Sequence, residues 1–96
     1  MSPTNKKKLG KLRVKLDILD NQLLKLIKKR SGLVNEVLKV KIHKKEIIDQ
    51  KRIKFILKKI KKKSLQLNID PKITNRIWKN MIWSSIDYEK RNLKKK

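Results

Sequence analysis

Apolar residues recur at alternating spacings of three and four between Leu9 and Ile42, and this long seam constrains the fold more than any other feature. Such spacing is typical of one face of a helix. At about 1.5 Å per residue the helix would be a rod of roughly 50 Å, too long to be covered by the ~50 residues that follow it. We therefore expect another chain to bury part of it, most simply a second copy. The seam consists of Leu9, Leu12, Leu16, Leu19, Leu23, Leu26, Leu33, Val37 and Val40.

Two shorter helices are expected after the seam. Apolar spacing predicts one from about Asp49 to Leu67 and another from Pro71 to about Arg91. Asp49 and Asp70 are suited to cap the first free amides of these helices, and Pro71 fits the first helical position. Since no segment alternates convincingly with a period of two, the sequence predicts an all-α fold of one long and two shorter helices.

The length suits one small domain. With 96 residues, of which 38% are hydrophobic, its own core would be marginal without help such as oligomerisation. We expect a single domain over residues 1–96, with a disordered leader over 1–8, a loop over 43–48 and a basic tail over 92–96. The chain has no cysteine, no secretory-signal pattern and no apolar run near the ~18 residues of a membrane span. These features favour the cytoplasm and no membrane partner.

The net charge of +22, from 30 Lys and Arg against 8 Asp and Glu, allows two interpretations. It is typical of proteins with an anionic partner, such as nucleic acid, a membrane surface or a small polyanion. Alternatively, most lysines fill surface positions where other helix-forming residues would serve, and runs such as 61–63 are solvated faces. We favour this second interpretation. No nucleic-acid-binding motif is present, so no nucleic-acid partner is expected. A basic helical nucleic-acid-binding protein is the alternative from another class.

Polar residues interrupt the apolar lines of the helices. Arg30 stands where the seam predicts a leucine, and at about 100° per residue it shares one line of the first helix with Val37 and Lys41. Ser85 and Glu89 continue an apolar line of the last helix. A charge on a buried line is costly unless an opposite charge meets it. The two cations of the first helix therefore point to an anionic ligand.

Arg13 and Arg52 add two further cations. Arg52 lies one turn into the second helix, where exposed amides already favour an anion. Arg13 lies 17 residues before Arg30, roughly 25 Å along the rod, so the two cannot hold one small ligand within one chain. In an antiparallel dimer each chain could lend Arg13 to the other's site.

Simple structural explanations also exist for these polar residues. Arg30 or Lys41 could reach solvent, and Glu89 could pair with a surface lysine.

In this order and at these spacings, the residues resemble the all-helical, type II class of chorismate mutases. The likeness covers residues 12–89. It rests on a Leu-Arg opening, an Asp-x-x-Asp pair at Asp17 and Asp20, an Arg and a Lys eleven apart, an Asp-x-x-Arg helix start, and a Ser followed four residues on by Glu. The segments that carry it are LRVKLDILDNQLLKLIKKRSGLVNEVLKVK, IIDQKRI and NIDPKITNRIWKNMIWSSIDYE.

The resemblance implies an intertwined homodimer that converts chorismate to prephenate, an isomerase reaction of aromatic amino acid biosynthesis, without cofactor or metal. It implies that Arg30 and the partner subunit's Arg13 hold the two carboxylates of the substrate. Lys41 would bond a carboxylate and the ether oxygen, which Glu89 would also face. The remaining implied residues are Asp49, Arg52 and Ser85 for binding, with Val37, Ile82 and Ile86 as apolar walls.

Two residues depart from the family pattern. Ile53 stands where the family usually has a Glu that accepts from the substrate's C4 hydroxyl. The related isochorismate-pyruvate lyases, which share the fold, also tend to carry an apolar residue at this position. Isochorismate-pyruvate lyase is therefore the alternative activity. Glu89 stands where bacterial members commonly have Gln. Because an ionised carboxylate would repel the developing oxyanion, Glu89 must carry a proton to donate, as in the fungal branch.

The residue types agree with this chemistry. A [3,3] rearrangement needs neither nucleophile nor metal, and the chain has no cysteine and one histidine. Holding a dianion in a compact conformer and placing donors at the breaking C–O bond can accelerate it. Arginine suits carboxylates because its planar fork pairs with both oxygens. A helical dimer without activity is the remaining alternative.

Overall fold

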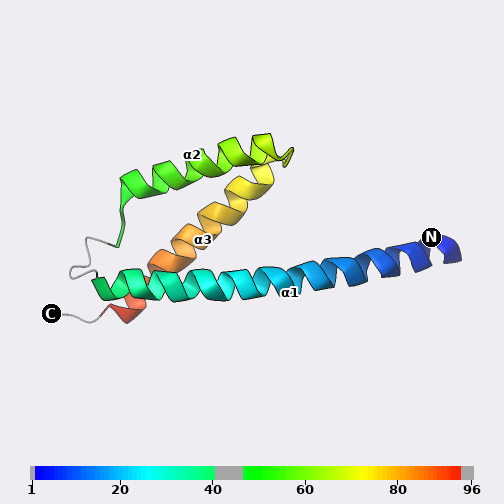
Figure 1. Cartoon of the computed structure of the whole chain (residues 1–96), viewed down its shortest axis with the longest axis horizontal. Coiled ribbons are helices and arrows are strands. Elements are labelled where there is room, and N and C mark those ends of the chain that lie inside the picture. Colours follow the sequence, from blue (N-terminus) through cyan, green and yellow to red (C-terminus); the bar gives the residue numbers. More distant parts are fainter. Residues whose placement is uncertain (1, 41–46, 94–96) are drawn as a thin grey trace. The chain divides into compact units, whose positions relative to one another are not determined.

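The computed structural model describes residues 2–40 and 47–93, which form three helices (Figure 1). They are α1 (Pro3–Val40), α2 (Gln50–Gln66) and α3 (Pro71–Asn92). The described residues contain no strand, so the expected all-α architecture of one long and two shorter helices is confirmed. The expected helix end at Ile42 and the first part of the expected loop, residues 43–46, lie outside the described residues.

The start of α1 differs from the expectation. The helix begins at Pro3 instead of near Leu9, so most of the segment expected to be a disordered leader is helical. Ser2 supplies the reason, because its Oγ accepts a hydrogen bond from Asn5 N at 3.2 Å and its carbonyl accepts from Lys6 N at 2.9 Å. Ser2 therefore acts as a cap, with Pro3 at the first helical position.

The chain divides into two compact units, Met1–Leu33 and Val34–Lys96, and the boundary falls within α1. The first unit is a length of single helix, and none of its described residues is buried. Its apolar seam is exposed in the isolated chain: Leu12, Leu16, Leu19, Leu23 and Leu26 keep between 54 and 59% of their accessible surface. The seam expected from the sequence is therefore present and uncovered.

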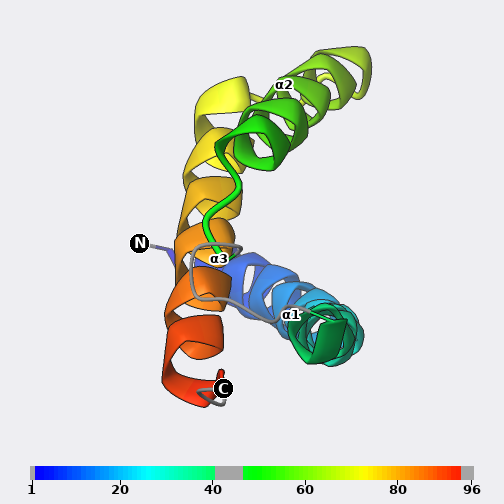
Figure 2. The same ribbon diagram turned by 90° about the vertical axis from the view of Figure 1, so that its left-hand side faces the viewer.

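In the second unit, α2 and α3 form a helical hairpin that diverges from a short connection (Figure 1), and Figure 2 shows the two helices running in different directions. Asn68 turns the chain there with a φ of 58°, a left-handed conformation that asparagine tolerates well. Ile69 N donates to Ser64 O at 2.8 Å and closes the end of α2. Beside it, the buried hydroxyls of Ser64 and Thr74 lie 2.7 Å apart and join the two helices.

The core of the second unit is small and lies along α3. Ile47, Ile82 and Ile86 are buried, with Ile47 only 3% exposed. Ile47 lies in a turn before α2, within the segment expected to be a loop, and its burial adds a core residue that the sequence did not predict. Packed against these three residues are Ile48, Ile53, Ile56, Leu57 and Leu93.

Both predicted caps are confirmed. Asp49 Oδ1 accepts from Arg52 N at 3.0 Å at the start of α2, and Asp70 Oδ1 accepts from Lys72 N at 2.9 Å at the start of α3. These bonds satisfy amides that have no partner inside the helix. Among the described residues, no helix combines the length and the apolar character needed to cross a membrane.

Candidate active site

The start of α2 positions two of the expected site residues. The Asp49 carboxylate is held at the helix end by its bond to Arg52 N, and the Arg52 guanidinium lies over the ring of Phe55, 5.4 Å from its centroid. Lys59 Nζ lies 5.9 Å from the same ring. A cation over an aromatic face is attracted by the ring's negative face. Phe55 therefore restrains Arg52, a contact not anticipated from the sequence although the spacing of three residues could have indicated it.

One face of α3 carries four more of the expected residues. Ile82, Ser85, Ile86 and Glu89 follow spacings of three, one and three, which places them along one side of the helix. Ile82, Ile86 and Glu89 are buried, and Ser85 is half-buried. Glu89 retains only 5% of its accessible surface. The line predicted from the sequence is therefore a buried face with a carboxyl at its end.

Ile53 links these two parts of the site. It is half-buried and packs against the cluster of Ile47, Ile82 and Ile86. The start of α2 is thereby fixed against the face of α3 by an apolar contact at the position next to Arg52. Asp49, Arg52, Ile82, Ser85, Ile86 and Glu89 all belong to the second unit.

The expected residues of α1 are divided between the units. Arg13 is exposed and Arg30 is half-buried, and both lie in the first unit. Seventeen residues of helix place them roughly 25 Å apart along α1, as the sequence predicted. Val37 lies in the second unit and is 49% exposed, and Lys41 lies outside the described residues.

Near the end of α1, one bond connects that helix to α3 within the second unit. Tyr88 Oη donates to Asn35 Oδ1 at 3.4 Å, which is long for a hydrogen bond. Leu38, three residues further along α1, is buried with 7% of its surface accessible. The last turns of α1 therefore belong to the packed part of the molecule.

Known proteins are similar in sequence to most of this chain. The family model of chorismate mutase type II matches residues 12–90. A chorismate mutase of Methanocaldococcus jannaschii is 36% identical over 76 residues, which cover 78% of this chain and 77% of the relative. No solved structure gives a significant match. The family match begins at Leu12 in α1, includes all of α2 and ends at Lys90 in α3.

Proposed function

The chain belongs to the chorismate mutase type II family, and we propose that two copies of it form the enzyme that rearranges chorismate to prephenate. The observation that carries this proposal is the family match over residues 12–90. The reaction is an isomerisation, and prephenate leads to the aromatic amino acids. Chorismate, a dicarboxylate, is the substrate.

The exposed seam of α1 supports a homodimer. Leu16, Leu19, Leu23 and Leu26 lie on one face and are each more than half exposed in the isolated chain. A continuous apolar stripe of this length is typical of a surface that another chain covers. A second copy offers the same stripe, and a two-fold axis lets each seam cover the other. An antiparallel arrangement supplies Arg13 to the site of the opposite chain.

The chemistry requires positioning and charge stabilisation. Chorismate must adopt a compact conformer in which the migrating side chain lies over the ring, and negative charge then builds on the ether oxygen as the C–O bond breaks. Fixing two carboxylates holds that conformer and removes the entropic cost of reaching it. Donors aimed at the ether oxygen stabilise the transition state more than the ground state.

The proposed residues divide these tasks between them. Arg30 and the partner subunit's Arg13 pair with the two carboxylates, since each guanidinium can bond both oxygens of a carboxylate. Lys41 bonds a carboxylate and the ether oxygen, and Arg52, held over Phe55, adds positive charge beside them. Asp49 and Ser85 complete the polar contacts, and Val37, Ile82 and Ile86 form the apolar walls.

Glu89 acts as the second donor to the ether oxygen. It can do so only while it carries a proton, because an ionised carboxylate accepts hydrogen bonds and repels the charge that develops on the oxygen. Its position four residues after Ser85, on the buried face of α3, supports this role.

Ile53 has a structural explanation that favours the mutase over the lyase. It packs against the core beside Ile82 and Ile86, so an apolar residue at this position stabilises the second unit. Packing therefore explains the apolar side chain of Ile53 without a change of substrate from chorismate to isochorismate. The C4 hydroxyl of chorismate would find its partner at the neighbouring Asp49, at the start of α2.

A turnover assay that offers chorismate and isochorismate separately tests the proposal. We expect the purified protein to form prephenate well above the uncatalysed rate, and to release pyruvate from isochorismate more slowly. Arg30→Ala should abolish most of the mutase activity, whereas Lys62→Ala, an equal loss of charge at an exposed position of α2, should retain it. Prephenate formation at the uncatalysed rate, or full activity in Arg30→Ala, would exclude the proposed mechanism.

A further inference from the structure

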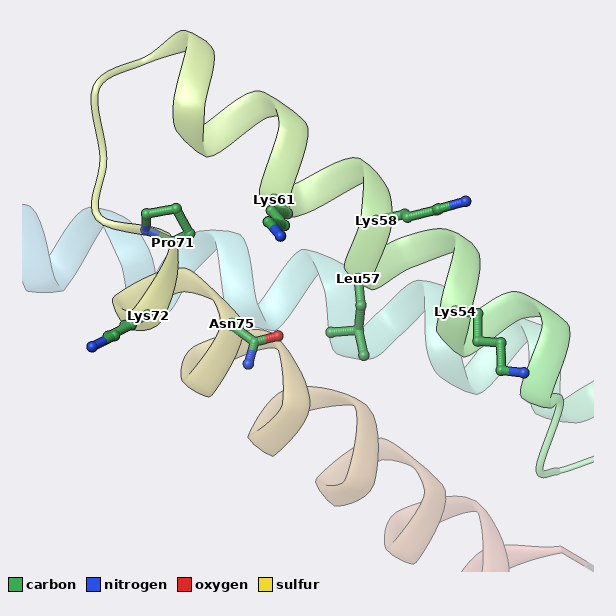
Figure 3. Close-up of a pocket in the computed structure, with 7 residues that line it drawn as sticks. All are labelled: Lys54, Leu57, Lys58, Lys61, Pro71, Lys72 and Asn75. Carbon is green, nitrogen blue, oxygen red and sulfur yellow. The ribbon is translucent and has the colours of Figure 1, made fainter.

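A second basic site lies between α2 and α3. A cleft of about 580 Å³ opens there (Figure 3). None of its seven lining residues belongs to the set proposed to bind chorismate, and none of the seven is acidic. The residues are Lys54, Leu57, Lys58 and Lys61 of α2, with Pro71, Lys72 and Asn75 of α3.

Helix geometry gathers three of these lysines on one side of α2. Lys54, Lys58 and Lys61 are spaced by four and three residues, so they fall within an arc of about 60° and extend over roughly 10 Å of the helix. This arc lies beside the apolar face of α2, and Lys72 of α3 also lines the cleft. Asp70, next to the lining Pro71, uses its carboxylate to cap α3.

The lining residues combine charge with an apolar floor. Leu57 points from α2 toward α3, and the amide of Asn75 points into the space between the helices (Figure 3). The lysine ammonium groups lie at the ends of flexible four-carbon stems, so they can turn onto an anion that enters. Clefts of this volume accommodate small molecules, with a few polar groups that fix their orientation.

We propose that this cleft binds a small organic phosphate. Its phosphate groups lie against Lys58, Lys61 and Lys72, since lysine is a strong point charge for phosphate. Its apolar part packs on Leu57 and Pro71. This site is separate from the proposed catalytic site and goes beyond the mutase reaction.

Charge favours a diffusible anion over a second copy of the chain in this cleft. Residues 3–33 carry ten basic and two acidic side chains, and the whole chain has a net charge of +22. A second copy would therefore bring further positive charge to four lysines, whereas an organic phosphate relieves their mutual repulsion. A phosphate with an apolar group also uses the floor of the cleft, which a sugar-phosphate backbone bound along the outside of α2 would leave empty.

Calorimetric titration of the full-length protein with adenosine triphosphate and with inorganic pyrophosphate tests the site. We expect adenosine triphosphate to bind more tightly, because only it carries a group for the apolar floor. The pair Lys58→Gln and Lys61→Gln should weaken its binding by about tenfold. The matched pair Lys59→Gln and Lys63→Gln removes the same charge from other sides of α2 and should change binding less than about twofold.

Three results would overturn the proposal. Equal weakening by both lysine pairs would show diffuse attraction to a basic helix. Tighter binding of a single-stranded oligonucleotide than of adenosine triphosphate, lost equally in both pairs, would assign the surface to nucleic acid. A change of molecular mass in the Lys58 and Lys61 variant would assign the cleft to a contact between chains. Arg30→Ala should leave phosphate binding unchanged, which separates this site from the mutase proposal.

Discussion

The buried hydroxyl pair of Ser64 and Thr74 gives a prediction that can be worked from individual atoms. Ser64 Oγ lies 2.6 Å from Ile60 O and 2.7 Å from Thr74 Oγ1. A hydroxyl has one proton, and Ser64 donates it to the carbonyl, so Thr74 must be the donor between the two side chains. The carbonyl of Pro71 is a weaker choice for Thr74, because it is 3.4 Å away.

Replacement of Thr74 by valine keeps the volume and removes this donor. A buried hydrogen bond contributes about 1 kcal/mol to the free energy of unfolding, and we expect a loss of that size. At a typical slope of about 1–3 kcal/mol/M, the urea midpoint falls by roughly 0.3–1 M. Ser64→Ala should cost somewhat less, because Thr74 can then turn to Pro71 O.

A double-mutant cycle isolates the contact. The free energy of unfolding of the wild type, Thr74→Val, Ser64→Ala and the double variant is measured by urea titration and circular dichroism. All four are measured at one fixed protein concentration, because the stability of the proposed dimer would depend on concentration. We expect the two losses to be coupled by about 1 kcal/mol. Additive losses, with a coupling near zero, would refute the assignment of a direct bond between the helices.

Three further predictions concern the proposed enzyme. Leu23→Asp should convert the dimer to an inactive monomer, whereas Asn21→Asp, an equal change of charge on the opposite side of α1, should leave both mass and activity intact, as light scattering and a mutase assay would show. Glu89→Gln, whose amide is always a donor, should keep mutase activity, whereas Glu89→Ala should lose most of it; full activity in Glu89→Ala would contradict the donor role. Phe55→Leu should raise KM more than it lowers kcat by releasing Arg52, and an unaltered KM would exclude the positioning role.

Local signals predicted most of the fold. Asp49 and Asp70 cap their helices as expected, because a cap depends on the residues immediately beside it. The predicted start of α1 was wrong. The polar, basic residues 1–8 are typical of a disordered leader, but the cap at Ser2 followed by Pro3 begins a helix there. Ile47 lies in a turn before α2, as expected, but its burial could not be predicted because it depends on residues of α3 that are far away in the sequence.

The site was predictable only where it follows a helix period. Predicting the face of α3 from Ile82 to Glu89 required only the angle between successive residues of a helix. The basic cleft was not found, since Lys61 and its neighbours resemble a solvated face until Lys72 and Asn75 of α3 lie opposite them. The contact between Arg52 and Phe55 depends on the side-chain conformations that the two residues adopt.

The exposed seam of α1 also affects how the protein would behave at low abundance. If two copies associate as proposed, a helix with this much leucine exposed to water gains much of its stability only when the second chain binds. Dilution would then remove fold and activity together, and freshly made chains would meet an aggregation risk until they found each other. At concentrations well below the dissociation constant of the proposed dimer, the amount of working catalyst would rise with the square of the monomer concentration.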